Sequence, residues 1–274
     1  SNDNYIKETQ AIFKLLLDKG LAYKAKGVQD YCPKCETVLA REQVKNGNCE
    51  RHDIPIEKKE LKQWYFKITD YKDRLIKNLD TIDYPEKTKK MQRAWLENLH
   101  DWCVSRQRKW GCSIPIENEE DTLDTFVDSS FYYIVYQLWK GLVPKQVDLY
   151  IGGSEHACMH LIYARFICMV MYDAGLIDFE EPFKKVIHQG MILKDGEKMS
   201  KSKGNTISPD DYDSGHLRFY LMFIGHYFDG GSFNDDNFKG IPRFVNKMKT
   251  WLLKSGKEEI KIEEFKQKIF QYTE

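Results

Sequence analysis

The sequence predicts an α/β fold in which a parallel sheet is covered by helices, with a small separate module near the start of the chain. Strand-like runs at 148–151 and 185–188 alternate with helical runs at 131–142 and 156–174, and such alternation is typical of parallel strands joined by crossover helices. Two closely spaced pairs of metal-ligating residues lie before residue 53. A chain of 274 residues is long enough to bury one substantial core beside such a module.

The remaining elements follow from local patterns. Residues 4–20 carry apolar side chains at helical spacing and stop at Gly20, which favours an amphipathic helix with a glycine cap. The alternation at 63–68 predicts a strand, and two lysine-rich amphipathic helices follow over 69–80 and 85–99. We expect these divisions: a first helix over 1–23, a module over 24–62, a connecting region over 63–100, an α/β part over 101–208 and a helical part over 209–274.

Cys32, Cys35, Cys49 and His52 follow the pattern C-x2-C, a gap of thirteen residues, then C-x2-H. This spacing presents three thiolates and one imidazole to a single tetrahedral ion, and zinc is the metal that prefers such a set. The alternative is four unrelated residues, although two such pairs seldom arise by accident within about twenty residues. Because the four ligands leave no open position, we expect a structural zinc site that stabilises a module with little core of its own.

Three lysines alternate with small residues in the segment 196–205, GEKMSKSKGN. The segment is too polar for a core, and its flanking glycines suit a loop that closes on a polyphosphate. A solvated lysine loop has the same composition, so the residues alone leave both interpretations open.

The segment 150–166, YIGGSEHACMHLIYARF, begins at the end of a strand-like run. Its glycine pair allows backbone to approach a ligand closely, and the helix that follows would place His156 and His160 one turn apart on one face. Taken alone, this pair fits a metal site, a substrate pocket or two packed histidines.

Together these segments resemble one family in the order of its signatures. Residues 198–202 are similar to the KMSKS signature of the class I aminoacyl-tRNA synthetases, and 150–166 resembles the leucyl form. The stretch 101–116, DWCVSRQRKWGCSIPI, is similar to a block shared by leucyl, isoleucyl and valyl enzymes, and 121–133, DTLDTFVDSSFYY, resembles a leucyl block. The residues around the first cysteines, YCPKCETVLAREQV, look like the leucyl zinc module.

The resemblance implies the second half of a Rossmann-type catalytic domain, a small zinc module and the start of a helical bundle. It implies activation of leucine with ATP and Mg2+, followed by transfer to tRNA(Leu). Lys198 and Lys201 would be catalytic and would bind the triphosphate. The adenosine would be held by Gly152, Gly153, Glu155, His156, Gln189 and Met191. Leucine would be enclosed by Phe126, Ser129, Tyr132, His156 and His160.

Two family features are not found in this sequence. Nothing matches HIGH, the signature of the first catalytic half, and only a handful of residues separate Trp95 from Asp101, where most leucyl enzymes insert an editing domain. We therefore expect no editing in this chain. Three hypotheses remain: a fragment or minimal form of a leucyl enzyme, a split or stand-alone homologue that takes HIGH from a partner chain, and a non-catalytic protein that binds tRNA or nucleotide.

The composition bears on the partners and the cellular compartment of the chain. The 42 basic and 42 acidic residues balance, so any tRNA contact must come from local patches and not from overall charge. The four cysteines outside the zinc pattern lie in apolar segments and are expected to be reduced. We find no secretory signal and no apolar run long enough to span a bilayer, and we expect a cytoplasmic enzyme without a membrane partner.

Overall fold

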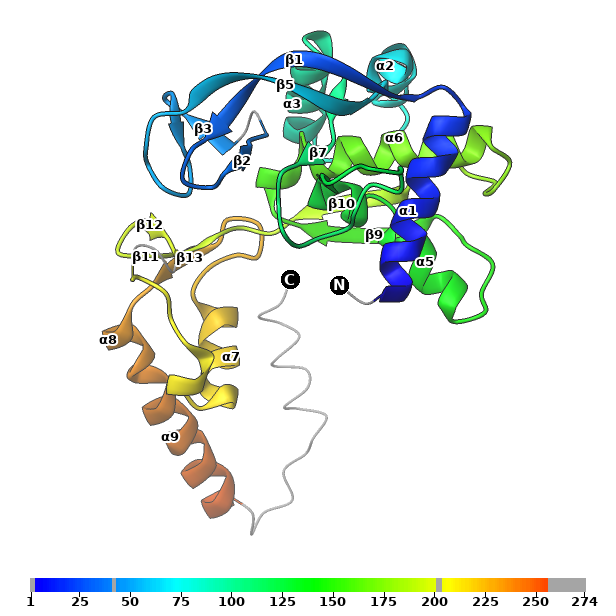
Figure 1. Cartoon of the computed structure of the whole chain (residues 1–274). Coiled ribbons are helices and arrows are strands. Elements are labelled where there is room, and N and C mark those ends of the chain that lie inside the picture. The colour runs from blue at the N-terminus through cyan, green and yellow to red at the C-terminus, as the bar shows by residue number, and fades with distance from the viewer. Residues whose placement is uncertain (1–2, 41–42, 201–203, 256–274) are drawn as a thin grey trace. The chain divides into compact units, whose positions relative to one another are not determined.

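The structure, a computed structural model, describes residues 3–40, 43–200 and 204–255 (Figure 1). The chain divides after His188 into two compact units, Ser1–His188 and Gln189–Glu274.

The first unit begins with helix α1 (Asp3–Asp18), which buries Ile12, Phe13 and Leu16. The backbone N–H of Leu21 donates to the carbonyl of Leu16 at 2.8 Å, and Gly20 adopts a φ of 69°. This is the glycine-capped end that the sequence predicts, because a left-handed residue lets the chain turn back and satisfy the last helical carbonyls. Helix α1 lies alongside helix α5 (Tyr132–Trp139) (Figure 1).

A long antiparallel hairpin of β1 (Ala22–Cys32) and β5 (Glu57–Phe66) forms the centre of a four-stranded sheet. The sheet has the order β2-β1-β5-β6, with β2 at Thr37–Val38 and β6 at Trp102–Cys103. Residues 63–66 of the predicted strand are therefore the end of a longer strand, which stops two residues earlier than expected. The chain between the two hairpin arms forms β2 and then a second pair of short strands, β3 (Val44–Lys45) and β4 (Asn48–Cys49). The hairpin thus joins the cysteine-bearing module directly to the core.

The two predicted lysine-rich helices are present but shorter than expected. They are α2 (Lys72–Asn78) and α3 (Glu86–Glu97), and a short 3-10 turn, η2 (Ile68–Tyr71), precedes α2. Only residues 98–101 separate α3 from β6, so this described stretch has no room for an inserted domain. Beyond β6 come β7 (Ser105–Arg106), β8 (Thr122–Leu123) and α4 (Thr125–Ser129).

The predicted parallel pair is formed by β9 (Val147–Gly152) and β10 (Phe183–His188). Helix α6 (His160–Asp173) connects the two strands, and every residue from His160 to Met171 is buried. A helix that is buried on all sides, and mostly apolar, is surrounded by protein. The parallel α/β arrangement expected from the sequence is confirmed here.

The predicted start of this helix is wrong. His156 belongs to a separate 3-10 turn, η3 (Ser154–His156), and α6 begins only at His160. The backbone of Met159, with φ of −99° and ψ of −84°, lies outside the helical region and interrupts the hydrogen-bond ladder. The two histidines therefore do not occupy successive turns of one helix.

The second unit contains a three-stranded sheet of order β12-β11-β13. Strand β11 (Ile192–Lys194) is antiparallel to β12 (Glu197–Lys198) and parallel to β13 (Gly231–Phe233). The helical part consists of η5 (Pro209–Asp211), α7 (Ser214–Phe223), α8 (Asp235–Phe238) and α9 (Gly240–Ser255). Tyr220, Phe233 and Ile241 form its small buried core. The predicted helices after residue 209 are present as far as the described residues extend.

A buried ion pair fixes α6 against the start of β10. Arg165 is fully buried, and its Nε and Nη2 each donate to the Glu181 carboxylate at 2.8 Å. Its remaining donors reach the Leu75 carbonyl at 2.8 Å and the Gln92 side-chain oxygen at 3.0 Å. The guanidinium is therefore matched by acceptors from α2, α3 and the segment before β10.

We predict that Glu181→Ala lowers the free energy of unfolding by about 3 to 5 kcal/mol, because the variant leaves the Arg165 charge buried without its carboxylate. Urea denaturation measures this change. Asp148→Ala is the control, since Asp148 pairs with Lys184 at the surface of the same unit, and exposed pairs contribute little. Equal stabilities of the two variants would contradict the prediction.

Candidate functional site

The four predicted metal ligands gather at one end of the β1–β5 hairpin. The ligand atoms of Cys32, Cys35, Cys49 and His52 all lie within 4.8 Å of one another. Nδ1 of His52 lies 3.2 Å from Sγ of Cys35 and 3.8 Å from Sγ of Cys32. Cys32 and Cys49 are buried, and Leu39 and a few partly buried apolar residues pack around them. The donor set and its spacing fit one tetrahedral metal ion.

The thiols of Cys32 and Cys35 in this cluster differ in pKa. Burial opposes ionisation of Cys32, but the His52 side chain, the Cys35 backbone and the other thiols donate to its sulfur and lower its pKa to about 6. Burial and the neighbouring sulfurs raise the pKa of Cys35 to about 12. Cys32 is therefore the thiol that ionises more readily than Cys35, and the neighbouring groups donate hydrogen bonds to its sulfur. A bound cation would take the place of these donated protons.

The loop that follows β9 holds four predicted nucleotide-binding residues. Gly152 ends the strand, Gly153 precedes η3, and Glu155 and His156 are exposed within the turn. A Cβ atom on Gly153 would come within 2.1 Å of the Glu155 carboxylate, so this carboxylate lies directly over the glycine. The structure thus brings these residues together on one short loop.

Three aromatic side chains surround the ring of His160 beside this loop. The Tyr150 hydroxyl lies 2.7 Å from Nε2 of His160, and the Tyr132 ring stacks on His160 with centroids 6.3 Å apart. The His156 ring lies edge-on to His160 at 6.4 Å. The two histidines are therefore neighbours even though they do not share a helix.

His160 is a buried neutral histidine. Burial, with a smaller contribution from the charge of His156, lowers the pKa of His160 to about 4. Its Nδ1 is buried and has no hydrogen-bond partner among the described residues. The ring therefore combines an apolar surface with one unsatisfied polar atom, which suits a wall of a small-molecule pocket.

The other predicted leucine-binding residues come from α4. Phe126 is partly buried and packs against Tyr163 of α6 with ring centroids 6.0 Å apart. The Ser129 hydroxyl donates to carbonyls of its own helix, to Thr125 at 3.4 Å and to Phe126 at 3.3 Å. Phe126, Tyr132 and His160 thus all touch the buried helix α6 or belong to it.

The predicted phosphate-binding lysines belong to the second unit. Asp195 and Gly196 both have positive φ, 54° and 77°, and form the tight turn between β11 and β12. Such a turn requires residues that tolerate the left-handed region, which Asp-Gly supplies. Lys198 ends β12 with its side chain exposed. Lys201 lies outside the described residues.

Backbone packing fixes the segment that holds Gln189 and Met191. Both side chains are exposed, and the Met191 carbonyl accepts a hydrogen bond from the Gly231 N–H at 3.2 Å. A Cβ on Gly190 would come within 1.9 Å of the Gly230 nitrogen. This crossing therefore requires glycine, and it holds the Gln189–Met191 backbone in one place within the second unit.

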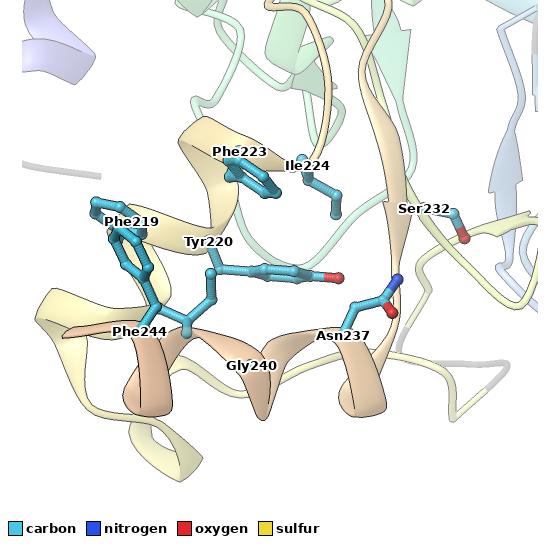
Figure 2. A pocket seen from close by; sticks show the side chains of 9 residues that line it. Phe219, Tyr220, Phe223, Ile224, Ser232, Asn237, Gly240 and Phe244 are labelled. Atoms are coloured by element: carbon cyan, nitrogen blue, oxygen red, sulfur yellow. The ribbon is translucent and has the colours of Figure 1, made fainter. Parts of the chain in front are cut away.

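The second unit also has an apolar groove of about 630 Å³ between α7 and α9 (Figure 2). Its lining comes mainly from Phe219, Tyr220, Phe223, Ile224, Ile241 and Phe244. Figure 2 shows aromatic rings of α7 directed toward α9. None of the predicted chemistry-bearing residues lines this groove.

Four residues near the first-unit loop were missed by the sequence analysis. Gln92 and His188 contact the loop, Tyr150 contacts His160, and Thr88 contacts His188. Alternation along β9 could have found Tyr150, because residues two apart in a strand share a face and Tyr150 precedes Gly152 by two. The other three come from distant segments, and no local pattern marks them.

Parallel strands joined by a buried helix, a glycine pair at the strand end and a lysine-bearing hairpin define the catalytic fold of a class I synthetase. The model of the family described as "tRNA synthetases class I (I, L, M and V)" matches residues 2–147 and 116–229 of this chain. The chain therefore belongs to this family.

Among curated proteins the chain is similar to leucine–tRNA ligases. The enzyme of Clostridium botulinum (strain Hall) is 28% identical over 512 residues, covering 94% of this chain and 63% of that protein. The enzyme of Clostridium perfringens (strain 13) is 27% identical over 502 residues, covering 89% and 61%. The chain thus spans less than two thirds of the length of these relatives. The aligned stretches are nearly twice as long as the chain's 274 residues, so the relatives carry long segments that this chain lacks.

Solved structures share the fold. The Agrobacterium radiobacter K84 agnB2 LeuRS in a ternary complex with tRNA and LeuAMS has a TM-score of 0.80 at 21% identity, covering 92% of this chain and 60% of that chain. Mycobacterium tuberculosis methionyl-tRNA synthetase in complex with methionyl-adenylate has a TM-score of 0.67 at 20% identity, covering 88% and 49%. Within the described residues, none of the helices is both long and apolar enough to cross a membrane.

We predict that His160 makes stability depend on pH between about 4 and 6.5. Because the pKa of His160 is lower in the folded chain, the unfolded chain binds the proton first as the pH falls. Stability from this group is complete above pH 6.5 and decreases by up to about 3 kcal/mol as the pH approaches 4.

Denaturant unfolding at several pH values tests this prediction with His160→Gln. The difference between wild type and variant should shrink as the pH falls from 7 to 4. His226→Gln is the control, because the His226 side chain is 66% exposed, and this variant should keep the wild-type slope. A constant difference for His160→Gln at every pH would contradict the assignment.

Proposed function

We propose that this chain is the part of a leucine–tRNA ligase that holds leucine and the adenosine of ATP, together with a structural zinc module. The observation that carries the proposal is the cluster of Tyr132, His156 and His160 beside the glycine pair that ends β9. An apolar, aromatic wall next to exposed backbone is what a branched aliphatic amino acid joined to a nucleoside requires. The family membership and the leucine-specific relatives support the same assignment.

In the proposed reaction, a carboxylate oxygen of leucine attacks the α-phosphorus of ATP, and the bond to the β-phosphate oxygen breaks to release pyrophosphate. A ribose hydroxyl at the tRNA end then attacks the acyl carbon of leucyl-adenylate and releases AMP. No covalent intermediate on the protein is required. The chain contributes by orienting the two reactants, which removes much of the entropic barrier of their encounter.

The proposed roles follow the chemistry of each residue. Phe126, Tyr132 and His160 enclose the leucine side chain, and the neutral state of His160 keeps that wall free of charge. Ser129 would add a small hydroxyl whose donor is already used within α4. Gly152 and Gly153 allow close approach of the adenosine, and Glu155 accepts hydrogen bonds from ribose hydroxyls. Gln189, Met191 and His156 are proposed to border the nucleotide.

Lys198 and Lys201 are proposed to stabilise the negative charge that develops on the phosphates. Positioned cations at developing charge are usually the largest electrostatic contribution to such a reaction. Mg2+ that accompanies ATP would add charge neutralisation on the phosphate oxygens. The tight Asp195-Gly196 turn before β12 supports this role, since it fixes the base of the lysine segment.

Zinc is proposed as the ion of the Cys32, Cys35, Cys49 and His52 cluster. Three thiolates and one imidazole are a donor set that suits zinc and fills its four positions. The ion would act structurally by linking the end of β1 and its turn to the end of β4 and the turn that follows it. Among the described residues of the module, the buried cluster around the ligands consists of Cys32, Leu39 and Cys49, and two of these three are ligands themselves, so metal binding would supply much of its folding free energy.

We predict that Cys49→Ser lowers bound zinc from one equivalent to a small fraction and makes residues 24–62 sensitive to limited proteolysis. The reason is that three ligands hold zinc much more weakly, and the module has little core to replace it. Metal analysis and protease digestion measure the two effects. Cys103→Ser, outside the cluster, should change neither. Unaltered zinc content and protease resistance in Cys49→Ser would exclude the zinc assignment.

Binding of adenylate analogues tests the proposed function on the chain as it stands. Titration calorimetry with the sulfamoyl analogue of leucyl-adenylate should give measurable affinity. The isoleucyl and methionyl analogues should bind at least about tenfold more weakly, which is the discrimination that a shaped apolar pocket gives. Failure to bind any analogue, or equal affinity for all three, would overturn the proposal.

Leucine-dependent exchange of pyrophosphate into ATP tests the chemical step. We predict that Lys201→Ala reduces this exchange by about 100-fold, because a cation at the developing charge is lost. The same variant should bind the sulfamoyl leucyl analogue within about twofold of wild type, since that analogue lacks the β- and γ-phosphates of ATP. Lys249→Ala on α9 is the matched control. Analogue binding without exchange in wild type would instead favour a non-catalytic binding role.

A further inference from the structure

The loop from Gly152 to Ala157 is held at both of its ends by one helix, α3. This loop carries the proposed adenosine contacts, so the inference below rests on the proposed function. Helix α3 contains none of the residues that the sequence analysis assigned to the site. Two of its buried side chains, Thr88 and Gln92, are four residues apart and therefore lie one turn apart on the same face.

The first end of the loop is held through His188, the last residue of β10. Nδ1 of His188 lies 2.8 Å from the Gly152 carbonyl oxygen, and its Nε2 lies 2.7 Å from the Thr88 hydroxyl. A carbonyl oxygen can only accept, so Nδ1 must carry the proton and donate. In the neutral ring Nε2 then accepts from Thr88. The buried hydroxyl thereby orients the ring, and the ring fixes the Gly152 carbonyl.

The second end is held by Gln92, which is fully buried. Its Nε2 donates to the Ala157 carbonyl at 2.8 Å, and its Oε1 accepts from Arg165 at 3.0 Å. Because Arg165 is a donor only, it decides which end of the amide faces it. The Gln92 NH2 group must therefore face Ala157. The buried Arg165–Glu181 pair thus also determines the contact between Gln92 and Ala157.

We propose that α3 positions the adenosine-binding loop, with His188, oriented by Thr88, and Gln92 as positioning residues for the nucleotide part of the substrate. None of the three touches the reacting atoms in this proposal. Their effect is to keep the carbonyls of Gly152 and Ala157 fixed, and with them the backbone of the glycine pair that the nucleoside approaches. Loss of these contacts should weaken adenosine recognition and leave leucine recognition unchanged.

Two replacements of His188 separate its two contacts. The side-chain nitrogen of Asn is bonded to Cγ, as is Nδ1 of His, so His188→Asn keeps a donor for Gly152 and loses Thr88. The amide of Gln extends one bond further, so His188→Gln keeps a group near Thr88 and loses the donor for Gly152. Thr88→Val removes the orienting hydroxyl with little change in shape.

Calorimetric titration with 5′-sulfamoyl-adenosine and with leucine gives the readout. His188→Gln should lose about tenfold or more in affinity for the adenosine ligand, the order expected when a buried hydrogen bond is removed. His188→Asn and Thr88→Val should each lose about threefold or less in affinity for the adenosine ligand. The double variant His188→Asn/Thr88→Val should bind this ligand no more weakly than either single variant, because both changes remove the contact between His188 and Thr88. Leucine affinity should stay at the wild-type value in all three single variants.

Equal adenosine affinities for His188→Asn and His188→Gln would overturn the proposal, as would a parallel loss of leucine affinity. Amide hydrogen exchange of residues 153–157 in the ligand-free chain provides a measurement that does not depend on the proposed function. Exchange should be faster in His188→Gln than in His188→Asn. If wild type binds no adenosine ligand, the proposed function fails, while the exchange comparison still decides whether His188 holds the loop.

Discussion

The ion pair of Arg165 and Glu181 is the contact on which the first unit depends most. It joins the middle of the buried helix α6 to the segment that leads into β10, and so closes the crossover between the two parallel strands. Burying an arginine is costly unless all its donors are satisfied. Here the guanidinium also reaches α2 through Leu75 and α3 through Gln92. One charged side chain thus sets the relative positions of three helices and a strand.

The candidate site inherits its geometry from this arrangement. Gln92 bonds both to Arg165 and to the Ala157 carbonyl, so the position of Arg165 helps to fix that carbonyl. His188 joins α3 to Gly152. The loop between these points can then be built from small and exposed residues and still be held at both ends. The polar contacts that position the loop are neutral or buried, so salt in the surrounding solution screens them weakly.

The cysteine-bearing module relies on a different kind of stabilisation. Its strands β1 and β5 continue directly from the core sheet, but the buried cluster at the metal ligands is small, with Leu39 beside Cys32 and Cys49. A donor set that binds one ion replaces a hydrophobic core in such a small region. The module's buried cluster is separate from the one that surrounds α6, so the two regions are stabilised by different side chains.

The sequence by itself determined the features that depend on local spacing. It predicted the capped helix α1 at Gly20, the parallel strands β9 and β10, the cysteine and histidine pairs, and the family through four ordered segments. These predictions succeed because a glycine cap, a strand or a closely spaced pair of metal-ligating residues needs only residues that are close along the chain. The start of α6 was misjudged, since the Met159 backbone conformation depends on how the preceding loop is held.

Only the tertiary structure decided which distant residues meet. Thr88 and His188 are 100 positions apart, and Arg165 and Gln92 are 73 apart, so no periodicity in the sequence links them. The neutral state of His160 likewise follows from burial among α5, α6 and β9, and burial is a property of packing. Local chemistry fixes what each residue can do, whereas the folded chain fixes which groups are close enough to do it together.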